Sequence, residues 1–123
     1  PLVESGQMRL VEGETEFAPG VRGVVTRGHT PGHMSIIFES DGQVAMFVCD
    51  MASYAVLFER IGWVAAYDVE PLESIETKRV WQKWALETNA LLIFPHDQLH
   101  PMARLVKDES GKPTLVQEKI EFA

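Results

Sequence analysis

TRGHTPGHMS, at residues 26–35, is the stretch on which the fold of this chain depends. It places His29 and His33 in a turn punctuated by glycine and proline, directly before the apolar run Ile36-Ile37-Phe38. The Pro-Gly pair before His33 stiffens the turn, which lowers the entropy cost of holding the imidazole at a fixed angle. The stretch therefore predicts an ordered histidine side chain at the entrance of a strand.

Two other predicted strands also end in a side chain that can bind a metal. Asp50 closes the apolar run at residues 44–49, and His96 follows the apolar run at residues 91–94 with one proline between them. An ionised carboxylate at the end of a buried strand is costly unless it is paired or bound to a cation. Imidazole and carboxylate together suit zinc, iron, manganese or cobalt better than calcium or magnesium. We therefore expect His33, Asp50 and His96 to converge on a metal site.

The composition is that of one globular domain. Of the 123 residues, 46% are hydrophobic and 24% are charged, which is enough for a buried core. The formal net charge of -7 argues against broad contact with phosphate groups, so we expect neither nucleic acid nor membrane as a partner. Cys49 is the single cysteine, which suits a reducing compartment, so we expect a cytoplasmic protein. We expect Cys49 itself to be a small apolar residue of a buried strand.

The remaining pattern predicts an α+β fold, a mixed sheet with one packed helix. Strands are expected at Met8–Val11, at Phe17 with Val21–Thr26, and at Met34–Glu39, Gln43–Cys49, Leu91–Phe94, Ala103–Glu109 and Thr114–Phe122. Asp41-Gly42 is a tight-turn signal and predicts a hairpin between the third and fourth of these strands. The helix should begin at Pro71 and run to about Thr88, with Asn89 as a left-handed stop. Residues 51–68 are aromatic without a clean period, which favours a loop or short helix over a pocket.

The predicted helix carries apolar residues that fall largely on one side and should face the core. They are Leu72, Ile75, Val80, Trp81, Trp84 and Ala85. The tryptophan pair could also form a platform for a ligand, but at helical spacing the core is the preferred place for both rings.

Three segments resemble, in order and spacing, the third, fourth and fifth metal motifs of the metallo-beta-lactamase superfamily. They are GHTPGHMS at residues 28–35, Cys49-Asp50, and FPHD at residues 94–97. The resemblance implies half of an αββα sandwich and a hydrolase that uses two divalent metal ions, zinc first, with iron, manganese or cobalt as alternatives. The lactonase-like branch is the most similar, which implies small ester, lactone or thioester substrates attacked by a metal-bound hydroxide.

By the same resemblance, individual residues acquire roles. His33 would bind the first metal, Asp50 would bridge both metals and His96 would bind the second, while His29 would be a non-ligand in the turn. Lactonases of this branch carry a tyrosine shortly after the bridging aspartate that polarises the substrate carbonyl. Tyr54 lies one residue beyond that position and is either this catalytic tyrosine or an aromatic residue lining the pocket.

One departure from the family is that the signature His-x-His-x-Asp-His is absent from this sequence. In the family that motif belongs to the N-terminal half, so the resemblance covers residues 1–123 as the C-terminal half of a metallo-beta-lactamase-like domain. The chain is then either a fragment of a larger hydrolase, which a start at Pro1 favours, or a natural half-domain that another chain completes. With only three ligands, the isolated chain is expected to bind metal weakly and not to turn over substrate.

The alternative function is a non-catalytic half-domain that self-associates or acts as a binding module. Half of a sandwich leaves one apolar sheet face uncovered, so we expect a homo-oligomer under either function.

The segment that begins at His96 can also be compared with a second known metal-binding motif. His96 and His100 have the four-residue spacing of the helical zinc-protease motif, but Pro95 and Pro101 exclude an extended helix. Asp97 between them is either a partner that orients a metal ligand or a turn former.

Overall fold

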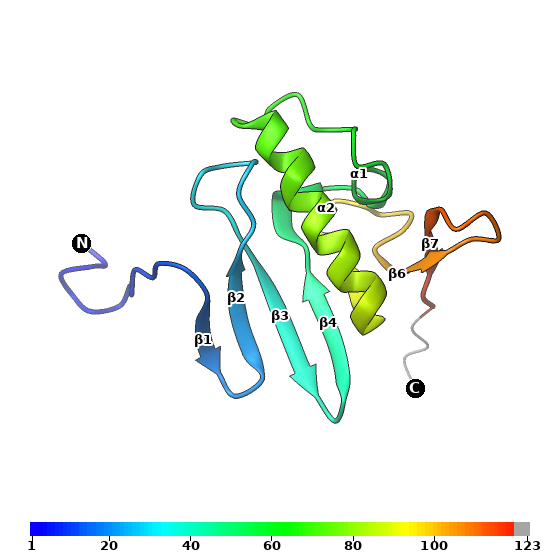
Figure 1. Ribbon diagram of the computed structural model, residues 1–123. Coiled ribbons are helices and arrows are strands. Elements are labelled where there is room, and N and C mark those ends of the chain that lie inside the picture. The colour runs from blue at the N-terminus through cyan, green and yellow to red at the C-terminus, as the bar shows by residue number, and fades with distance from the viewer. Residues whose placement is uncertain (120–123) are drawn as a thin grey trace.

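The computed structural model describes residues 1–119 and contains one seven-stranded sheet whose strands lie in sequence order (Figure 1). The strands are β1 (Thr15–Ala18), β2 (Val21–Val25), β3 (Met34–Ser40), β4 (Gln43–Phe47), β5 (Leu91–Ile93), β6 (Met102–Lys107) and β7 (Pro113–Gln117). All neighbours are antiparallel except β4 and β5, which are parallel because helical segments carry the chain back to the starting end of β4. The predicted mixed sheet with a packed helix is confirmed.

The β3–β4 hairpin forms at the Asp-Gly pair that predicts it. Asp41 has a φ of 50° and Gly42 a φ of 74°, the left-handed conformations that a tight two-residue turn requires. Pairing then runs from Ser40 opposite Gln43 to Ile36 opposite Phe47. The hairpin therefore brings the entrance of β3 beside the exit of β4.

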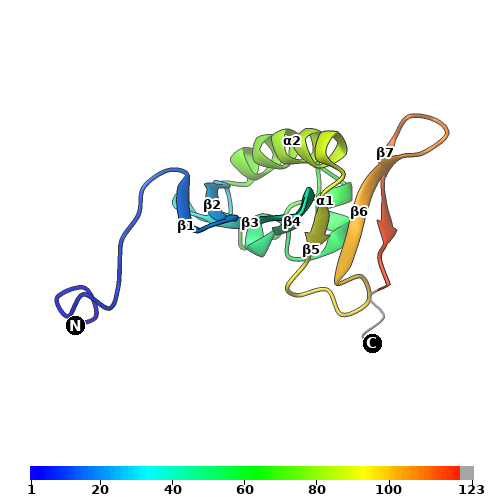
Figure 2. The same cartoon turned by 90° about the horizontal axis from the view of Figure 1, so that it is seen from below.

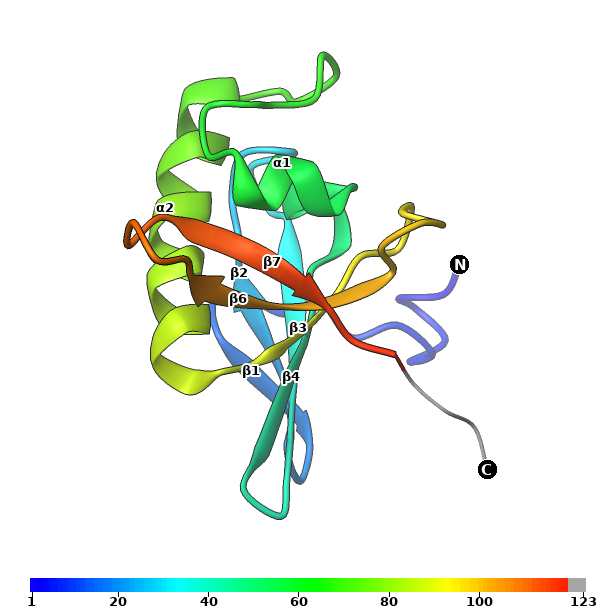
Figure 3. The same ribbon diagram turned by 90° about the vertical axis from the view of Figure 1, so that its right-hand side faces the viewer.

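Three helical segments connect β4 to β5: η1 (Cys49–Ala52), α1 (Ala55–Glu59) and α2 (Pro71–Thr88). The long helix α2 begins with Pro71 in its first turn and ends at Asn89, whose φ is 52°, as the sequence predicts. Figure 3 shows α1 at the end of the sheet opposite the β3–β4 turn, and α2 along one face. None of the helices within residues 1–119 is both long and apolar enough to cross a membrane.

The core lies between α2 and one face of the sheet (Figure 2). Its fully buried members come from the strands, η1, α1 and α2: Val24, Ile37, Met46, Val48, Met51, Ala52, Ala55, Phe58, Ala85, Leu92, Phe94, Ala103 and Leu105. Trp81 and Trp84 are partly buried against this cluster with their rings edge to face at 5.3 Å, so their assignment to the core is confirmed.

The opposite sheet face carries apolar side chains that no layer covers within the described residues. One row pairs Ile36 with Phe47 and Phe47 with Ile93, and each of these side chains is only half-buried. In the next row Phe38 pairs with Ala45, and the Phe38 side chain is 40% exposed. A sheet with one packed and one open apolar face is the half-sandwich that the sequence predicts.

The structure corrects the predicted face of α2. Leu72 and Val80 are exposed, whereas the buried side chains of the helix are mostly polar: Ser74, Thr77, Lys78, Gln82 and Ala85. Backbone carbonyls explain this inversion, because the side chain of Gln82 donates to the carbonyls of Phe58 and Glu59 at the end of α1. A helix facing unpaired carbonyls needs donors, which a search for apolar periodicity overlooks.

Several predicted strands also differ from the observed ones, most clearly at Met8–Val11, at the end of β4 and at the last strand. The strand expected at Met8–Val11 is wrong, because this exposed segment has no neighbouring strand and extends away from the sheet (Figure 2). β4 ends at Phe47, since Cys49 takes a φ of 53° and starts η1. The last strand is β7, and the end of the predicted range at residues 120–122 lies outside the described residues.

Candidate metal centre

Sheet topology brings the three predicted ligands to one edge. His33 directly precedes β3 and Asp50 follows β4, and these two strand ends are adjacent because the strands form a hairpin. His96 follows β5, which is parallel to β4 with Ile93 beside Phe47. Parallel strands end at the same edge of a sheet, so His96 reaches the edge that carries Asp50.

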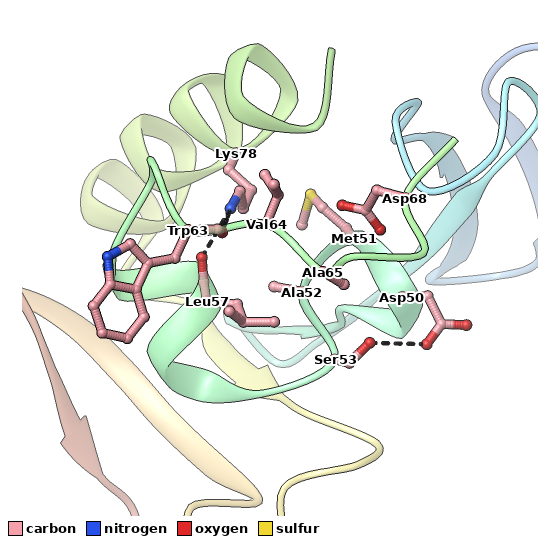
Figure 4. A pocket seen from close by; sticks show the side chains of 10 residues that line it. All are labelled: Asp50, Met51, Ala52, Ser53, Leu57, Trp63, Val64, Ala65, Asp68 and Lys78. Atoms are coloured by element: carbon pink, nitrogen blue, oxygen red, sulfur yellow. Dashed lines mark hydrogen bonds between the residues drawn. The ribbon is translucent and has the colours of Figure 1, made fainter. Parts of the chain in front are cut away.

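Asp50 is the meeting point of the two histidines. Its backbone N–H donates to Nε2 of His33 across 3.0 Å, and Nε2 of His96 lies 3.0 Å from its Oδ1 atom. The hydroxyl of Ser53 donates to the same Oδ1 atom at 3.3 Å, as the dashed line in Figure 4 shows. The structure therefore brings together all three residues that the sequence selects.

His33 is held in one ring orientation. Its Nδ1 atom lies 3.0 Å from the carbonyl oxygen of Thr26 and 2.7 Å from the Thr26 hydroxyl, and a second hydroxyl, from Ser35, lies 2.9 Å from that of Thr26. A carbonyl partner assigns the ring proton to Nδ1, and Nε2 then carries the free electron pair. Metal-binding histidines are oriented in this way by a partner on the other ring nitrogen.

Burial favours the neutral form of His33. Loss of hydration lowers the pKa of this imidazole; the backbone hydrogen bond to Thr26 acts against that effect, and the neighbouring His29 adds to it. A neutral imidazole is the form that binds metals, so the electrostatics of His33 fit a ligand.

Cys49, next to Asp50 in the chain, does not fit a reactive role. Burial raises the pKa of its thiol to about 11, and the negative charge of Asp50 adds to the effect. The thiol is therefore protonated at neutral pH and a poor nucleophile, as the sequence predicts, although Cys49 is half-buried in η1 and does not lie in a strand.

The loop that carries His96 is fastened by the residue after it. Asp97 accepts a hydrogen bond from the backbone N–H of Ala55, at the start of α1, across 3.0 Å. Its other oxygen accepts from the backbone N–H groups of Leu99 at 3.0 Å and His100 at 2.8 Å. Asp97 thus forms a turn and also ties the His96 loop to α1, which confirms its role as a turn former; its role as a partner that orients a metal ligand stays a prediction.

His29 lies in the site, although the sequence assigns it no more than a place in the turn. Its Nδ1 atom is 3.1 Å from Oδ1 of Asp68, and its Nε2 atom is 3.9 Å from Oδ2 of Asp50. The other oxygen of Asp68 accepts from the hydroxyl of Ser74 at 2.9 Å. Asp68 follows an irregular loop and carries no motif, so the one sequence signal for this arrangement is His29, the first histidine of the turn.

A tyrosine other than the predicted one contacts His29 and Ser53. Tyr67 donates from its hydroxyl to Ser53 at 3.5 Å, and its ring meets that of His29 edge to face at 5.8 Å. Tyr54 precedes α1 with its side chain 46% exposed. The catalytic role of Tyr54 stays a prediction.

The donor set fits a divalent metal in kind, but the donors contact one another. Within residues 1–119, no group of three or more His, Cys, Asp or Glu side chains surrounds a common point as a metal site does. The reason is local: Nε2 of His33 faces the Asp50 amide, and His96 pairs directly with the Asp50 carboxylate. Two imidazoles and one carboxylate are ligands that zinc accepts, and they make up three of the donors that such a centre needs.

Known proteins are similar to this chain in sequence and in fold, although no family model matches it. The chain is 34% identical over 91 residues to an N-acyl homoserine lactonase of a Bacillus species. It also shares the fold of the crystal structure of hydrolase AbOPH in the beta lactamase superfamily, with a TM-score of 0.76 over 97% of this chain and 19% identity. The chain is therefore similar in sequence to part of a lactonase and shares the metallo-beta-lactamase fold.

Two further structures of the superfamily fold are similar over nearly the whole chain. A probable metal-dependent hydrolase from Staphylococcus aureus gives a TM-score of 0.80 at 24% identity, covering 96% of this chain and 42% of that protein. AidC, a dizinc quorum-quenching lactonase in complex with the product N-hexanoyl-L-homoserine, gives 0.79 at 16% identity, covering 96% of this chain and 40% of that one. Identities this low speak for the fold alone.

The chain spans only part of the length of the relatives that it matches. The match to the Bacillus lactonase covers 72% of this chain but 35% of the lactonase, so the chain spans about a third of the length of that relative. The AbOPH comparison covers 41% of the known structure. The matched part corresponds to the C-terminal half of the superfamily fold.

Proposed function

We propose that this chain is the C-terminal part of a dinuclear metal-dependent hydrolase, in which His33, Asp50 and His96 bind the metal ions. The meeting of both imidazoles at Asp50 is the observation that carries this proposal. Zinc is the first candidate, because the donor set is imidazole and carboxylate and one structural neighbour is described as a dizinc lactonase.

The proposed reaction is hydrolysis of a small ester, lactone or thioester. When bound, divalent metals in such a site lower the pKa of water towards neutrality and so supply a hydroxide nucleophile. Within the chain, Thr26 holds His33 with its free electron pair on Nε2, and Asp97 holds the His96 loop against α1. Asp50 presents two carboxylate oxygens between these supports, which suits a ligand shared by two cations.

The substrate class rests on the relatives. The curated relatives at 33–34% identity are N-acyl homoserine lactonases, and AidC is described with a homoserine product. We infer a lactone or a similar small ester as the substrate, and Tyr54 as a candidate for polarising its carbonyl.

The rest of the centre must come from outside residues 1–119. The open apolar face formed by β3, β4 and β5 is a surface on which another layer can pack, and the chain covers about a third of its relatives. We infer that a missing N-terminal half, or a second chain, completes the metal site and covers this face. The isolated chain is then expected to bind metal weakly and to lack hydrolase activity.

A second candidate function is non-catalytic and uses the same open face of the sheet. Half-buried apolar side chains on three neighbouring strands, such as Ile36, Phe47 and Ile93, fit a half-domain that self-associates or binds a partner. This function requires no metal, so metal binding separates the two candidates.

Zinc titration of the purified chain, followed by calorimetry, tests the proposed ligands. His33→Ala, Asp50→Asn and His96→Ala should each weaken zinc binding by at least about tenfold, since each removes a direct ligand. His100→Ala is the matched control, because this exposed histidine lies outside the donor set. Equal zinc affinity in His33→Ala and His100→Ala would contradict the proposal.

A further inference from the structure

The strongest unexplained feature beside the proposed ligands is a buried carboxylate on a chain of polar contacts. The side chain of Asp68 is 5% exposed, and both of its oxygens are engaged, one by His29 and the other by Ser74. A buried carboxylate is retained only where it is paired or hydrogen-bonded. The contacts of Asp68 with His29 and Ser74 are therefore what allows this carboxylate to be buried.

Ser74 anchors this chain of contacts to a rigid element. It is buried in α2, and its backbone N–H donates to the carbonyl of Glu70 at 2.9 Å. Gly28 approaches it so closely that a Cβ atom there would lie 2.3 Å from the Ser74 hydroxyl. The turn that carries the histidines is thus pressed against the start of α2.

Backbone hydrogen bonds fix the same contact. The N–H of Val69 donates to the carbonyl of His29 at 3.2 Å, and the N–H of Glu70 donates to that of Gly28 at 2.9 Å. Two backbone hydrogen bonds therefore join the loop before α2 to the histidine turn. The His29 ring, held at Nδ1 by Asp68, has a defined direction.

The His29 ring lies next to two of the proposed ligands. Nε2 of His29 faces Oδ2 of Asp50 at 3.9 Å, whereas His96 and Ser53 both contact Oδ1. The ring of His29 also packs edge to face on the ring of His33, with centroids 5.7 Å apart. His29 thus lies beside two of the three proposed ligands, Asp50 and His33.

The geometry points to His29 as a positioning residue that Asp68 and Ser74 brace and that sets the orientation of the Asp50 carboxylate and the His33 ring. The inference rests on the proposed metal role of Asp50 and His33. Oδ1 of Asp50 lies 3.0 Å from Nε2 of His96 and Oδ2 lies 3.9 Å from Nε2 of His29, so each carboxylate oxygen has an imidazole neighbour. Groups that orient metal ligands in this way typically affect metal affinity by about ten- to hundredfold.

Two amide variants separate positioning from a purely structural role. His29→Asn places its amide nitrogen near the position of Nδ1, so it keeps the hydrogen bond to Asp68 and loses the contact with Asp50. His29→Gln places its amide nitrogen near the position of Nε2, so it keeps the contact with Asp50 and leaves Asp68 short of a partner. Zinc affinity by calorimetry and the thermal midpoint of the 123-residue chain are measured for both.

The expected results are opposite for the two variants. His29→Asn should keep the thermal midpoint and bind zinc about ten- to hundredfold more weakly. His29→Gln should lose thermal stability and keep zinc affinity within about threefold, as expected when the contact with the ligand is retained. Unchanged zinc affinity in His29→Asn, or a loss in His29→Gln as large as that expected for His29→Asn, would overturn the inference.

His33→Ala, measured in parallel, distinguishes this failure from failure of the proposed function. A drop in zinc affinity in His33→Ala, together with none in His29→Asn, overturns the role of His29 alone. No drop in either variant, or no zinc binding by the unsubstituted chain at millimolar metal, overturns the metal role of His33 as well.

Discussion

The backbone N–H of Asp50 donates to Nε2 of His33 across 3.0 Å, so the atom that would bind a metal already accepts a hydrogen bond. Nε2 has a single electron pair and cannot serve the amide and a cation together. Zinc binding should therefore release the Asp50 amide. In ¹H–¹⁵N spectra of the chain, the Asp50 resonance should shift on addition of zinc and return on addition of a chelator.

The exposed turn between β6 and β7 provides the control for that measurement. The amide of Lys112 donates to Asp108 there, far along the chain from the proposed ligands, and its resonance should stay in place. A spectrum in which zinc shifts other amides and leaves that of Asp50 unchanged would argue against His33 as a ligand.

Gly28→Ala should be among the most damaging single-methyl changes in the chain. A Cβ atom at this position would lie 2.3 Å from the Ser74 hydroxyl and 2.5 Å from its Cα atom, and the residue has a φ of +132°. Overpacking and backbone strain together should lower the free energy of unfolding by at least about 3 kcal/mol, measured by urea denaturation. Gly32→Ala, in the same turn with nothing within 4 Å of the new atom, should change it by less than about 1 kcal/mol.

Asp97→Asn should destabilise the chain at neutral pH and much less in acid. Desolvation raises the pKa of Asp97, but the backbone hydrogen bonds from His100, Ala55 and Leu99 outweigh it, and the pKa lies below its ordinary value. A lowered carboxyl pKa stabilises the folded state above the unfolded pKa of about 4, and that stability is lost as the pH falls through the folded pKa.

The expected cost of Asp97→Asn at pH 7 is about 1–3 kcal/mol, because hydrogen bonds to a charged acceptor are weakened. Urea denaturation at pH 7 and at pH 3 measures the change. Asp41→Asn in the β3–β4 turn is the control, since asparagine tolerates the φ of 50° at that position. An equal destabilisation by Asp97→Asn at both pH values would show that its charge does not matter.

Lys78 predicts a stability change in alkaline solution. This side chain is 1% exposed and donates to the carbonyls of Leu57 and Trp63, as Figure 4 shows. Burial lowers the pKa of Lys78 to about 8, against the opposing charge of Asp68. The unfolded chain binds the proton more tightly, so between pH 8 and about 10.4 this group should make the folded state progressively more stable.

Lys78→Met should remove that alkaline gain and leave two carbonyls without their donor. The variant should be less stable than the parent by about 1–3 kcal/mol at pH 8, and the gap should widen towards pH 10. Thermal or urea denaturation across this range measures both effects. Lys83→Met, on the exposed side of α2, is the matched control and should follow the parent. A parallel pH dependence for Lys78→Met and its parent would contradict the lowered pKa.

The sequence predicts the proposed ligands of this fold better than the contacts that support them. His33, Asp50 and His96 can be selected because each closes or precedes an apolar run, and strand pairing then places them together. The position of His29 depends on Asp68, which is 39 residues away in an irregular loop. No local pattern encodes such a pair, because its geometry is set by how the loop packs on α2.

The buried face of α2 also depends on contacts that no local sequence pattern encodes. Apolar periodicity predicts that Leu72 and Val80 face inward, but the helix buries Lys78 and Gln82 to satisfy carbonyls of the segment that contains α1. The carbonyl groups that need donors belong to the segment that contains α1, whereas the donors belong to α2. The need for polar residues on α2 can therefore be recognised only when both segments are placed in space.

Self-association of the isolated chain is the last expectation, and it follows from the open sheet face. Phe38 is 40% exposed in a row with Ala45 and Leu91, opposite the helix-covered core. Apolar surface of this extent favours pairing of two copies through their sheets when no other layer covers it. Light scattering with size exclusion should show a dimer for the parent chain.

Phe38→Glu should shift this dimer to the monomer, since it places a charge in the apolar face. Leu72→Glu is the control, because Leu72 is 78% exposed on α2, on the other side of the molecule, and its replacement should leave the dimer intact. Dissociation by Leu72→Glu instead would place the contact on the helix side and leave the open sheet face free for the missing half of the fold.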